Sequence, residues 1–448
     1  MVTRGLKNRT AMALVLAAAA PMTLVFARAV DAQTVTGGAE TSANSGYVTM
    51  SAPRIDPLGD IGPSLVPQGF EPVGARVGSF MFFPQIEVTG TFDDNIYATN
   101  TAGEDDFITR YMAGAVMQST WADDELHFGG AYVYSDYADN EDESASDAGL
   151  IGGGAFRLGT STTFAFEGTY QWLTEDRASN DLPGFQAEPT DVELFDVWAT
   201  LTHRFNRLTA AVGAGFQSAD YDDVPLFGGG TLDMDERDRQ KTTWMGYLGY
   251  ELTPGYSFYL RGSLYDIDYD LQPPAVFFNR DSEGYEVLAG ISFELTRLVN
   301  GHVAIGFFEQ DYDFAGFGTV DGLDFSANLT WEASERTRVV LDGSRSVEET
   351  QLLFSSSYVR TRFGIGVVHA LYPNINISAG VARTDDDYES IFGFARDDQG
   401  WDVNAGAVWF INRNLSANFD FRYTDRDSNT VLFEFERTRV GGGLTIRF

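Results

Sequence analysis

The stretch GLDFSANLTWEASERTRVVL, residues 322–341, contains two apolar segments joined by a short polar turn. In its first half, apolar and polar residues alternate strictly. The apolar positions are Leu323, Phe325, Ala327, Leu329 and Trp331, and the polar positions are Asp324, Ser326, Asn328, Thr330 and Glu332. A period of two is typical of a β-strand with one apolar and one polar face. Ser334 to Thr337 then form the turn, and a second such segment begins at Arg338. The stretch therefore predicts an antiparallel hairpin.

The same pattern recurs along most of the chain. We place 18 segments, which begin near Phe80, Phe107, Leu126, Gly149, Thr162, Val192, Leu208, Thr242, Ser257, Glu283, His302, Gly322, Arg338, Tyr358, Ile375, Trp401, Leu415 and Phe433. Connections after even-numbered segments are short, as at Asn206-Arg207, whereas most connections after odd-numbered segments are long and acidic, as at 174–190 and 384–400. A soluble two-sheet sandwich explains the alternation within strands but not this alternation between connections. We therefore predict an all-β, transmembrane, antiparallel up-and-down barrel of about 18 strands, with 16 as the alternative, short periplasmic turns and long extracellular loops.

The N-terminal region has the features of an export signal. Arg4, Lys7 and Arg9 precede an apolar run from Ala11 to Phe26, and Val30-Asp31-Ala32 places small residues before a cleavage point. This tripartite pattern predicts a signal peptide over residues 1–32. Residues 33–75, rich in Gly, Ser, Thr and Pro, are predicted to be a flexible periplasmic leader, and 76–448 the barrel. We accordingly expect an integral protein of the outer membrane of a Gram-negative bacterium.

Composition excludes several functions. The formal net charge is −35 and the chain has two lysines, so a nucleic-acid partner is not expected. There is no cysteine, and there are only four histidines, His127, His203, His302 and His369, all read as turn or interfacial residues. Acidic runs such as Asp385 to Asp387 follow no calcium-loop spacing and are read as solvated loop charge. We expect no enzyme activity, no cofactor and no metal site.

The polar positions of the strands are expected to line a lumen. Acidic and basic candidates fall on different segments. The acidic candidates are Glu286, Glu294, Asp324 and Glu332, and the basic candidates are Arg360, Arg362, Arg422, Arg437 and Arg439. One interpretation is a transverse electric field that orients dipolar solutes and sets ion preference. The other is a set of Arg–carboxylate pairs between strands that stiffen the wall or fill the lumen. The sequence leaves both open.

The last segment has a specific pattern. Apolar Val440, Gly442, Leu444, Ile446 and Phe448 alternate with Arg439, Gly441, Gly443, Thr445 and Arg447. This resembles the last-strand signal that barrel proteins present to the outer-membrane assembly machinery. Leu444, Ile446 and Phe448 are therefore the predicted assembly signal. Outer-membrane lipid and lipopolysaccharide are the other expected partners, with tyrosine and aspartate marking the loop rim.

Several motifs resemble one known family. They are Gly74 to Phe80, Phe83 to Val88, Phe92 to Ala98, Asp106 to Ile108, Trp121 to Asp123 and Leu126 to Gly129. The chain resembles the putative β-barrel porin 2 family of outer-membrane proteins. The resemblance implies an outer-membrane barrel with a link to envelope polysaccharide, and it implies no particular site residue.

Two functions follow as expectations. A barrel of 16 to 18 strands is too wide for its wall side chains to fill, which predicts a porin-like passive channel for ions or small hydrophilic solutes. The alternative is a structural or accessory barrel for exopolysaccharide export, with polysaccharide-export components as partners. The predicted leader is too short for a folded plug domain, which disfavours a TonB-dependent transporter.

Overall fold

The computed structural model describes residues 67, 69–101, 103–179, 186–273, 275–296, 298–350, 352, 354–391 and 396–448. They form one antiparallel sheet of 19 strands that closes on itself. The short β1 (Ala75–Val77) pairs only with β2 and lies outside the ring, which leaves 18 strands in the barrel. The predicted signal peptide and most of the predicted leader lie outside the described residues.

The 18 strands follow one another around the ring in chain order. They are β2 (Phe80–Asp93), β3 (Asp106–Ser119), β4 (Glu125–Tyr137), β5 (Ala145–Arg157), β6 (Thr162–Thr174), β7 (Asp191–Phe205), β8 (Leu208–Tyr221), β11 (Arg239–Thr253), β12 (Tyr256–Tyr269), β13 (Ser282–Thr296), β14 (Val299–Tyr312), β15 (Thr319–Ser334), β16 (Thr337–Glu349), β17 (Ser355–Tyr372), β18 (Ile375–Ser390), β19 (Asp397–Asn412), β20 (Leu415–Ser428) and β21 (Phe435–Arg447). β21 pairs with β2, from Gln85 opposite Arg447 to Asp93 opposite Arg439, and this closes the ring. The predicted architecture and the strand number of 18 are confirmed.

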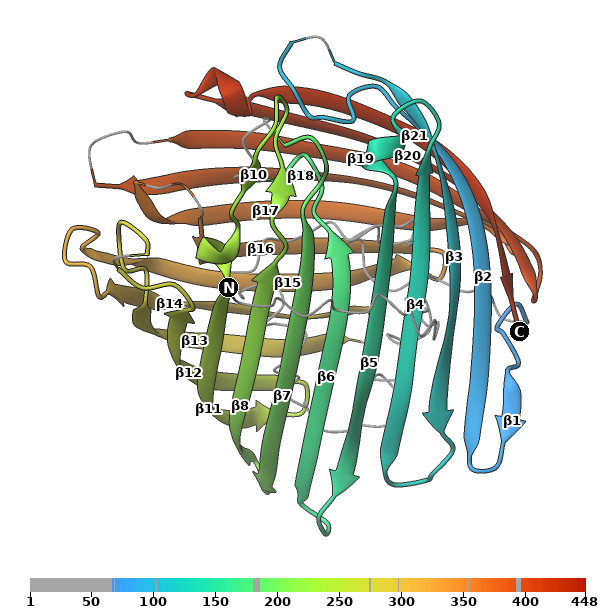
Figure 1. Ribbon diagram of the computed structural model, residues 1–448. Coiled ribbons are helices and arrows are strands. Elements are labelled where there is room, and N and C mark those ends of the chain that lie inside the picture. Colours follow the sequence, from blue (N-terminus) through green and yellow to red (C-terminus); the bar gives the residue numbers. More distant parts are fainter. Residues whose placement is uncertain are drawn as a thin grey trace.

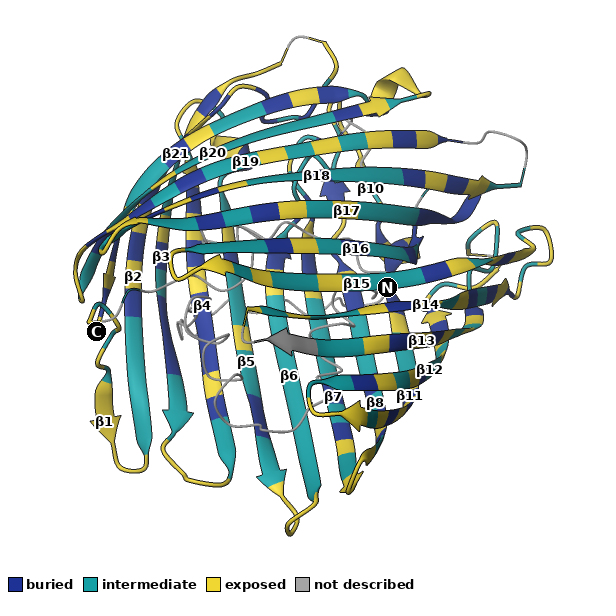
Figure 2. Cartoon of the chain, turned by 180° about the vertical axis from the view of Figure 1, so that it is seen from behind, coloured by how far each residue is buried: buried dark blue, intermediate teal, exposed yellow. Residues whose placement is uncertain are grey.

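Strands on opposite walls cross at a steep angle in Figure 1, which is the strand tilt that a closed barrel requires. Exposure alternates along each strand, as the banded colouring of Figure 2 shows. On β12, Phe258, Leu260 and Leu264 are exposed, whereas Ser257 and Arg261, at alternate positions of the same strand, are buried. The strand period of two therefore separates an apolar outer face from a polar inner face.

Short and long connections lie at opposite ends of the barrel. We call these ends the short-turn rim and the long-loop rim. At the short-turn rim, two residues join β7 to β8, and Asn206 there adopts a positive φ of 59°, a conformation that asparagine tolerates in tight turns. The β8–β11 connection at the other rim is long enough to hold its own hairpin, β9 (Val224–Pro225) with β10 (Thr231–Leu232).

Within the described residues, helical structure is limited to three 3₁₀ turns, all in the loops: η1 (Glu141–Glu143), η2 (Asp235–Arg237) and η3 (Val431–Phe433). No helix in the described part of the chain is both long and apolar enough to cross a membrane.

One predicted loop is shorter than expected. The acidic stretch 384–400 was predicted to be a long loop, but β18 continues to Ser390 and β19 already begins at Asp397. Asp385 to Asp387 therefore belong to the strand ladder opposite β19. The reason is a local partner: Asp386 is buried and its carboxylate binds the Arg360 guanidinium at 2.8 Å. The prediction of solvated loop charge was wrong for this residue.

Candidate functional site

The predicted lumen residues lie on the inner face wherever their side chains are described. An exposed apolar residue comes directly before each of three acidic candidates: Tyr285 before Glu286, Leu323 before Asp324 and Trp331 before Glu332. The same holds for Arg362 beside Phe363 and Arg439 beside Val440. Arg360, Arg422 and Arg437 share the inner face by the same period of two. For Glu294 the structure gives the backbone position, on β13 opposite Asn300 of β14.

Most of these charges are engaged in ion pairs with the opposite charge. Arg261 of β12 binds Glu286 at 2.7 Å, Arg338 of β16 binds Glu332, and Arg360 binds Asp386. Arg422 of β20 binds Asp402 of β19 at 2.7 Å, and Arg362 approaches Asp342 at 3.5 Å. Such pairing cancels charge locally, so the geometry favours the interpretation of interstrand pairs at these positions. Asp324 is buried, and its Oδ1 accepts no hydrogen bond from the described residues.

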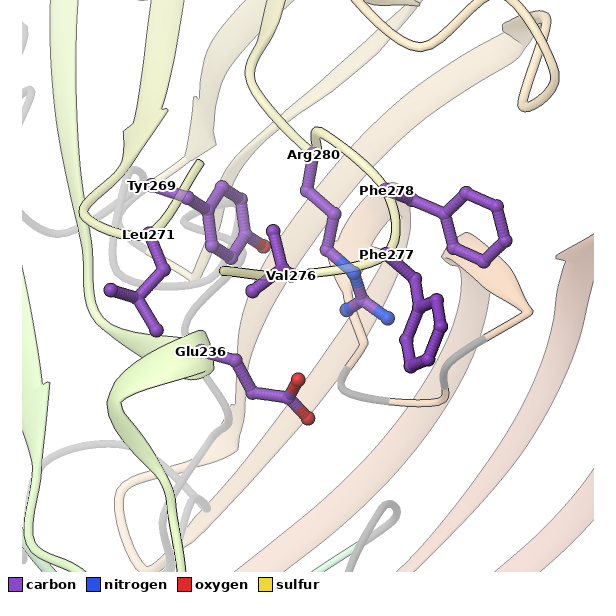
Figure 3. Close-up of a pocket in the computed structure, with 7 residues that line it drawn as sticks. All are labelled: Glu236, Tyr269, Leu271, Val276, Phe277, Phe278 and Arg280. Atoms are coloured by element: carbon purple, nitrogen blue, oxygen red, sulfur yellow. The ribbon is translucent and has the colours of Figure 1, made fainter. Parts of the chain in front are cut away.

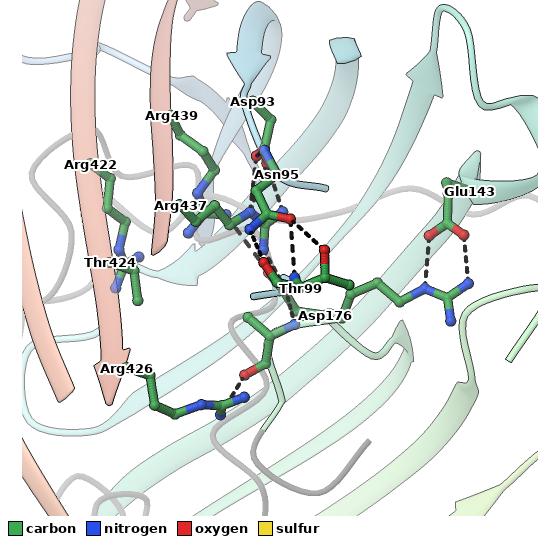
Figure 4. A network of polar contacts seen from close by, with 12 residues as sticks. Asp93, Asn95, Thr99, Glu143, Asp176, Arg422, Thr424, Arg426, Arg437 and Arg439 are labelled. Carbon is green, nitrogen blue, oxygen red and sulfur yellow. Dashed lines mark hydrogen bonds and ion pairs between the residues drawn. The ribbon is translucent and has the colours of Figure 1, made fainter. Parts of the chain in front are cut away.

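Arg437 of β21 lies at the centre of a larger network (Figure 4). Its Nε and Nη2 donate to the carboxylate of Asp93 on β2, with the shortest distance 2.7 Å. Its Nη1 donates to Oδ1 of Asp176, also at 2.7 Å. Arg437 and Asp93 are almost completely buried. A buried guanidinium needs such compensation, because an unpaired charge is strongly disfavoured away from water.

Asp176 belongs to a loop that bridges distant parts of the barrel. We call residues 175–179, which directly follow β6, the anchor segment. Its first three side chains bind three different elements: Glu175 binds Arg237 of η2 at 2.8 Å, Asp176 binds Arg437 of β21, and Arg177 binds Glu143 of η1 at 2.5 Å. The Ala178 carbonyl also accepts a hydrogen bond from Arg426 of β20 at 3.1 Å.

The anchor segment therefore spans a chord of the barrel. β6 and β21 are five strand-to-strand steps apart around a ring of 18 strands. Asp176 contacts β21 and Ala178 contacts β20, so the chain leaves β6, runs inward from the wall and is held at the other end of this arc of strands. The result is a narrowed lumen close to the long-loop rim.

Electrostatics keep Asp176 ionised at this position. Burial by itself would raise its pKa, but the positive charges of Arg437 and Arg439 outweigh burial and hold the pKa well below the usual carboxyl range. A hydrogen bond from the Ala178 backbone N–H to Oδ1, at 2.8 Å, acts in the same direction. The Asp176 carboxylate is therefore an anion at every physiological pH.

A second bridge crosses the rim elsewhere. Arg280, in the β12–β13 connection, donates to the backbone carbonyls of Thr350 and Leu352 after β16. The Tyr269 hydroxyl donates to Glu349 at 2.7 Å. A small pocket opens beside this contact, and Figure 3 shows Arg280 extending between Tyr269 and Phe277 at its edge. Both bridges reduce the opening at the long-loop rim.

One group of carboxylates is close enough to share a cation. Asp223, Asp233 and Asp235, in the β8–β11 connection, have ligand oxygens within 4.8 Å of one another. All three are exposed, and two of them accept backbone hydrogen bonds, Asp223 from Met234 and Asp233 from Asp235. Those bonds give the cluster a structural role in the turn that leads into η2.

The histidines lie near the short-turn rim, as the sequence indicated. His203 and His369 contact Thr162 and Thr337 through Nδ1, at 2.7 and 2.9 Å. His127 is more buried than a turn residue would be, since it lies on the inner face of β4 within 3.8 Å of Glu125.

The predicted assembly signal lies on the outer face of β21. Leu444, Ile446 and Phe448 are 54%, 43% and 53% exposed, so all three side chains point away from the lumen. This is the face that a partner approaching from outside the barrel would meet.

The anchor segment was not predicted as a site. The run Glu175-Asp176-Arg177 reads in the sequence as solvated loop charge, and its partners Arg237 and Arg437 are 62 and 261 positions away. No local pattern connects residues at such separations.

Comparison with solved structures finds barrels of low overall similarity. The ferric enterobactin receptor of Pseudomonas aeruginosa aligns with a TM-score of 0.45 and 8% identity, over 82% of this chain and 81% of that chain. The Pseudomonas aeruginosa protein OpdL aligns with a TM-score of 0.41 and 11% identity, over 83% of this chain and 99% of that chain. No curated protein matches the sequence significantly.

A family comparison covers the whole described part of the chain. The model of the family described as putative beta-barrel porin 2 matches residues 67–448, which include every strand of the barrel. The chain, a closed antiparallel β-barrel of 18 strands with a charged inner face, belongs to the putative beta-barrel porin 2 family.

Proposed function

We propose that the protein is a passive channel for ions or small hydrophilic solutes in the outer membrane of a Gram-negative bacterium. The observation that carries this proposal is the separation of the two barrel faces. Apolar side chains such as Leu260 and Leu264 cover the outside, and ion-paired side chains such as Arg261 and Glu286 line the inside. An apolar outer face suits lipid, and a polar inner face suits water.

The two bridges at the long-loop rim favour small solutes over polymers. The anchor segment is fastened to β20 and β21 by an ion pair and a hydrogen bond, and Arg280 fastens the β12–β13 connection to residues after β16. We expect these two bridges to hinder a polysaccharide chain more than ions and small solutes, because the chain is wider. The alternative, an accessory barrel for exopolysaccharide export, therefore has less support from the geometry.

Conductance measurements test the channel. Refolded protein is added to planar lipid bilayers in potassium chloride, and heat-modified gel mobility confirms that the barrel is folded. We expect discrete, ohmic conductance steps, together with swelling of liposomes in small sugars that declines as sugar size increases. Folded protein that gives neither steps nor swelling would exclude a passive channel and leave the accessory role.

A further inference from the structure

Two arginines face each other across neighbouring strands of the inner wall. Arg422 of β20 lies directly opposite Arg439 of β21, and Arg439 in turn lies opposite Asp93 of β2. Like charges directly opposite each other in a sheet are destabilising unless an anion lies between or beside them. The wall therefore carries a site with a built-in requirement for negative charge.

The wall carboxylates near this site are already engaged. Asp93 accepts three hydrogen bonds from Arg437 and one from the Asn95 backbone N–H. Asp402 accepts hydrogen bonds from Arg422 and Thr424. In the described part of the chain, the one ion-pair partner of Arg439 is Asp176, with Nη1 and Oδ2 at 3.7 Å.

Asp176 differs from the two wall carboxylates because it comes from a loop. Asp420 of β20 and Arg110 of β3 also interact electrostatically in this part of the wall. The charges therefore balance as four arginines, Arg110, Arg422, Arg437 and Arg439, and four carboxylates, Asp93, Asp176, Asp402 and Asp420. Removing Asp176 would leave the wall with one excess positive charge facing the lumen. Asp93 and Asp402 cannot leave in this way, since each is held in a strand ladder.

We propose that Arg437 and Arg439 form a binding site for a small solute that bears a carboxylate, and that Asp176 occupies this site as an internal competitor. The proposal rests on the channel function above and names the class of solute. A solute carboxylate would displace the Asp176 side chain from the two arginines, whereas Glu175, Arg177 and the Ala178 carbonyl would still hold the anchor segment. The bound solute would then narrow the path for chloride.

The geometry fits a carboxylate in particular. One oxygen of Asp176 binds Arg437 and the other faces Arg439. Each arginine therefore lies next to a different oxygen of one planar carboxylate. The contact with Arg439 is longer than a hydrogen bond, because Asp176 is tethered to its loop and to the Ala178 N–H. An untethered carboxylate could approach both guanidinium groups at hydrogen-bond distance.

Acetate is the probe for this site. We would measure how acetate reduces chloride current through single channels, in the wild type and in Asp176→Asn, Arg439→Gln and Asp402→Asn. Asp176→Asn keeps the Oδ1 acceptor for Ala178, removes the negative charge and replaces the oxygen that faces Arg439 by an NH2 group. We expect its apparent acetate affinity to rise at least about threefold, which is the effect of one unit charge roughly 6 Å away in a water-filled lumen.

The other two variants distinguish acetate binding at the two arginines from a general effect of lumen charge. Arg439→Gln should lose acetate inhibition, because one of the two guanidinium groups is missing. Asp402→Asn changes the lumen charge by the same amount as Asp176→Asn, but leaves the competitor in place, so its acetate affinity should rise less. Equal affinities in the wild type and Asp176→Asn, in channels that conduct, would overturn the carboxylate site and leave the channel function intact.

Absence of conductance in every folded variant would instead refute the channel function. The carboxylate site is then tested by the acetate-dependent shift in melting temperature of the detergent-solubilised barrel. The shift should be largest for Asp176→Asn and absent for Arg439→Gln. Identical shifts in both variants would refute the site.

Discussion

Replacing Asp93 by asparagine should destabilise the barrel far more than the same change at an exposed ion pair. Asp93 is completely buried, and its carboxylate binds both Nε and Nη2 of the buried Arg437. The introduced amide would keep one acceptor oxygen, but it would lack the negative charge and place an N–H₂ group against the guanidinium. Arg437 would then depend on Asp176 alone for compensation.

The size of the effect follows from burial. Removing one partner of a buried ion pair costs about 3–5 kcal/mol when the remaining charge is left uncompensated. Because Asp176 still neutralises Arg437, we expect about 2–3 kcal/mol for Asp93→Asn, which is below the cost of leaving a buried charge uncompensated. The matched control is Asp123→Asn, which breaks the pair with Arg157 at 2.9 Å, where the two side chains are 73% and 51% exposed. That control should cost less than about 1 kcal/mol.

Urea unfolding in lipid vesicles measures both values. The seven tryptophans provide the fluorescence signal, and unfolding and refolding curves must coincide before a free energy is extracted. The expected result is a clearly lower urea midpoint for Asp93→Asn and little change for Asp123→Asn. Equal shifts in the two variants would show that burial of the Arg437 network contributes nothing, and would refute the reasoning.

Three further predictions concern the outer face, the assembly signal and pH. Ile305→Arg, on the exposed face of β14, should lower the free energy of unfolding in lipid vesicles by about 2–4 kcal/mol. Phe277→Arg, in an exposed loop, should lower it by less than about 0.5 kcal/mol. Similar losses in the two variants would contradict a lipid-facing β14. Phe448→Ser should lower the amount of protein in the outer-membrane fraction several-fold without changing conductance after refolding in vitro; an unchanged amount would rule out the assembly role. Burial and the negative charges of Asp220, Asp235 and Asp270 raise the pKa of Asp238 to about 7, although the hydrogen bond from the Tyr221 N–H lowers it. The folded loop therefore favours the protonated form of Asp238. Stability should therefore be full at low pH and fall as pH rises toward and through about 7, and Asp238→Asn should remove that part of the dependence in a melting-temperature series. An identical pH profile in wild type and variant would contradict it.

The strand order, the two faces and the phase of turns and loops could be predicted from the sequence. All of them depend on local alternation and on pairing with the next strand, as in the hairpin of residues 322–341. Predicted strand starts agree with the structure within four residues, as at Gly149 against Ala145 of β5. Most of the differences arise because strands extend past the apolar alternation into polar residues that still pair across the ladder. The start predicted at Phe433 differs in the other direction, because Phe433 lies in η3 and β21 begins at Phe435.

The candidate site could be predicted from the sequence only in part. Arg437 and Arg439 were expected in the lumen because they alternate with Val440, and the structure places both on the inner face. Their partners were not predicted, since an arginine on an inner face can pair with a carboxylate on either neighbouring strand or on any loop that folds inward. The sequence therefore left the transverse field and the interstrand pairs as equal alternatives.

Local periodicity alone thus determined that this chain forms a series of antiparallel strands with one apolar and one polar face, because each strand needs only its neighbours in sequence to turn its polar face inward and pair its backbone. Closure of the ring and the path of the anchor segment were decided by the tertiary structure. Arg437 meets Asp93 across 344 positions and Asp176 across 261. Such contacts depend on which strand the last one closes against and on where a long loop folds. These are properties of the whole ring that no local pattern encodes, and they convert a charged wall into a candidate binding site.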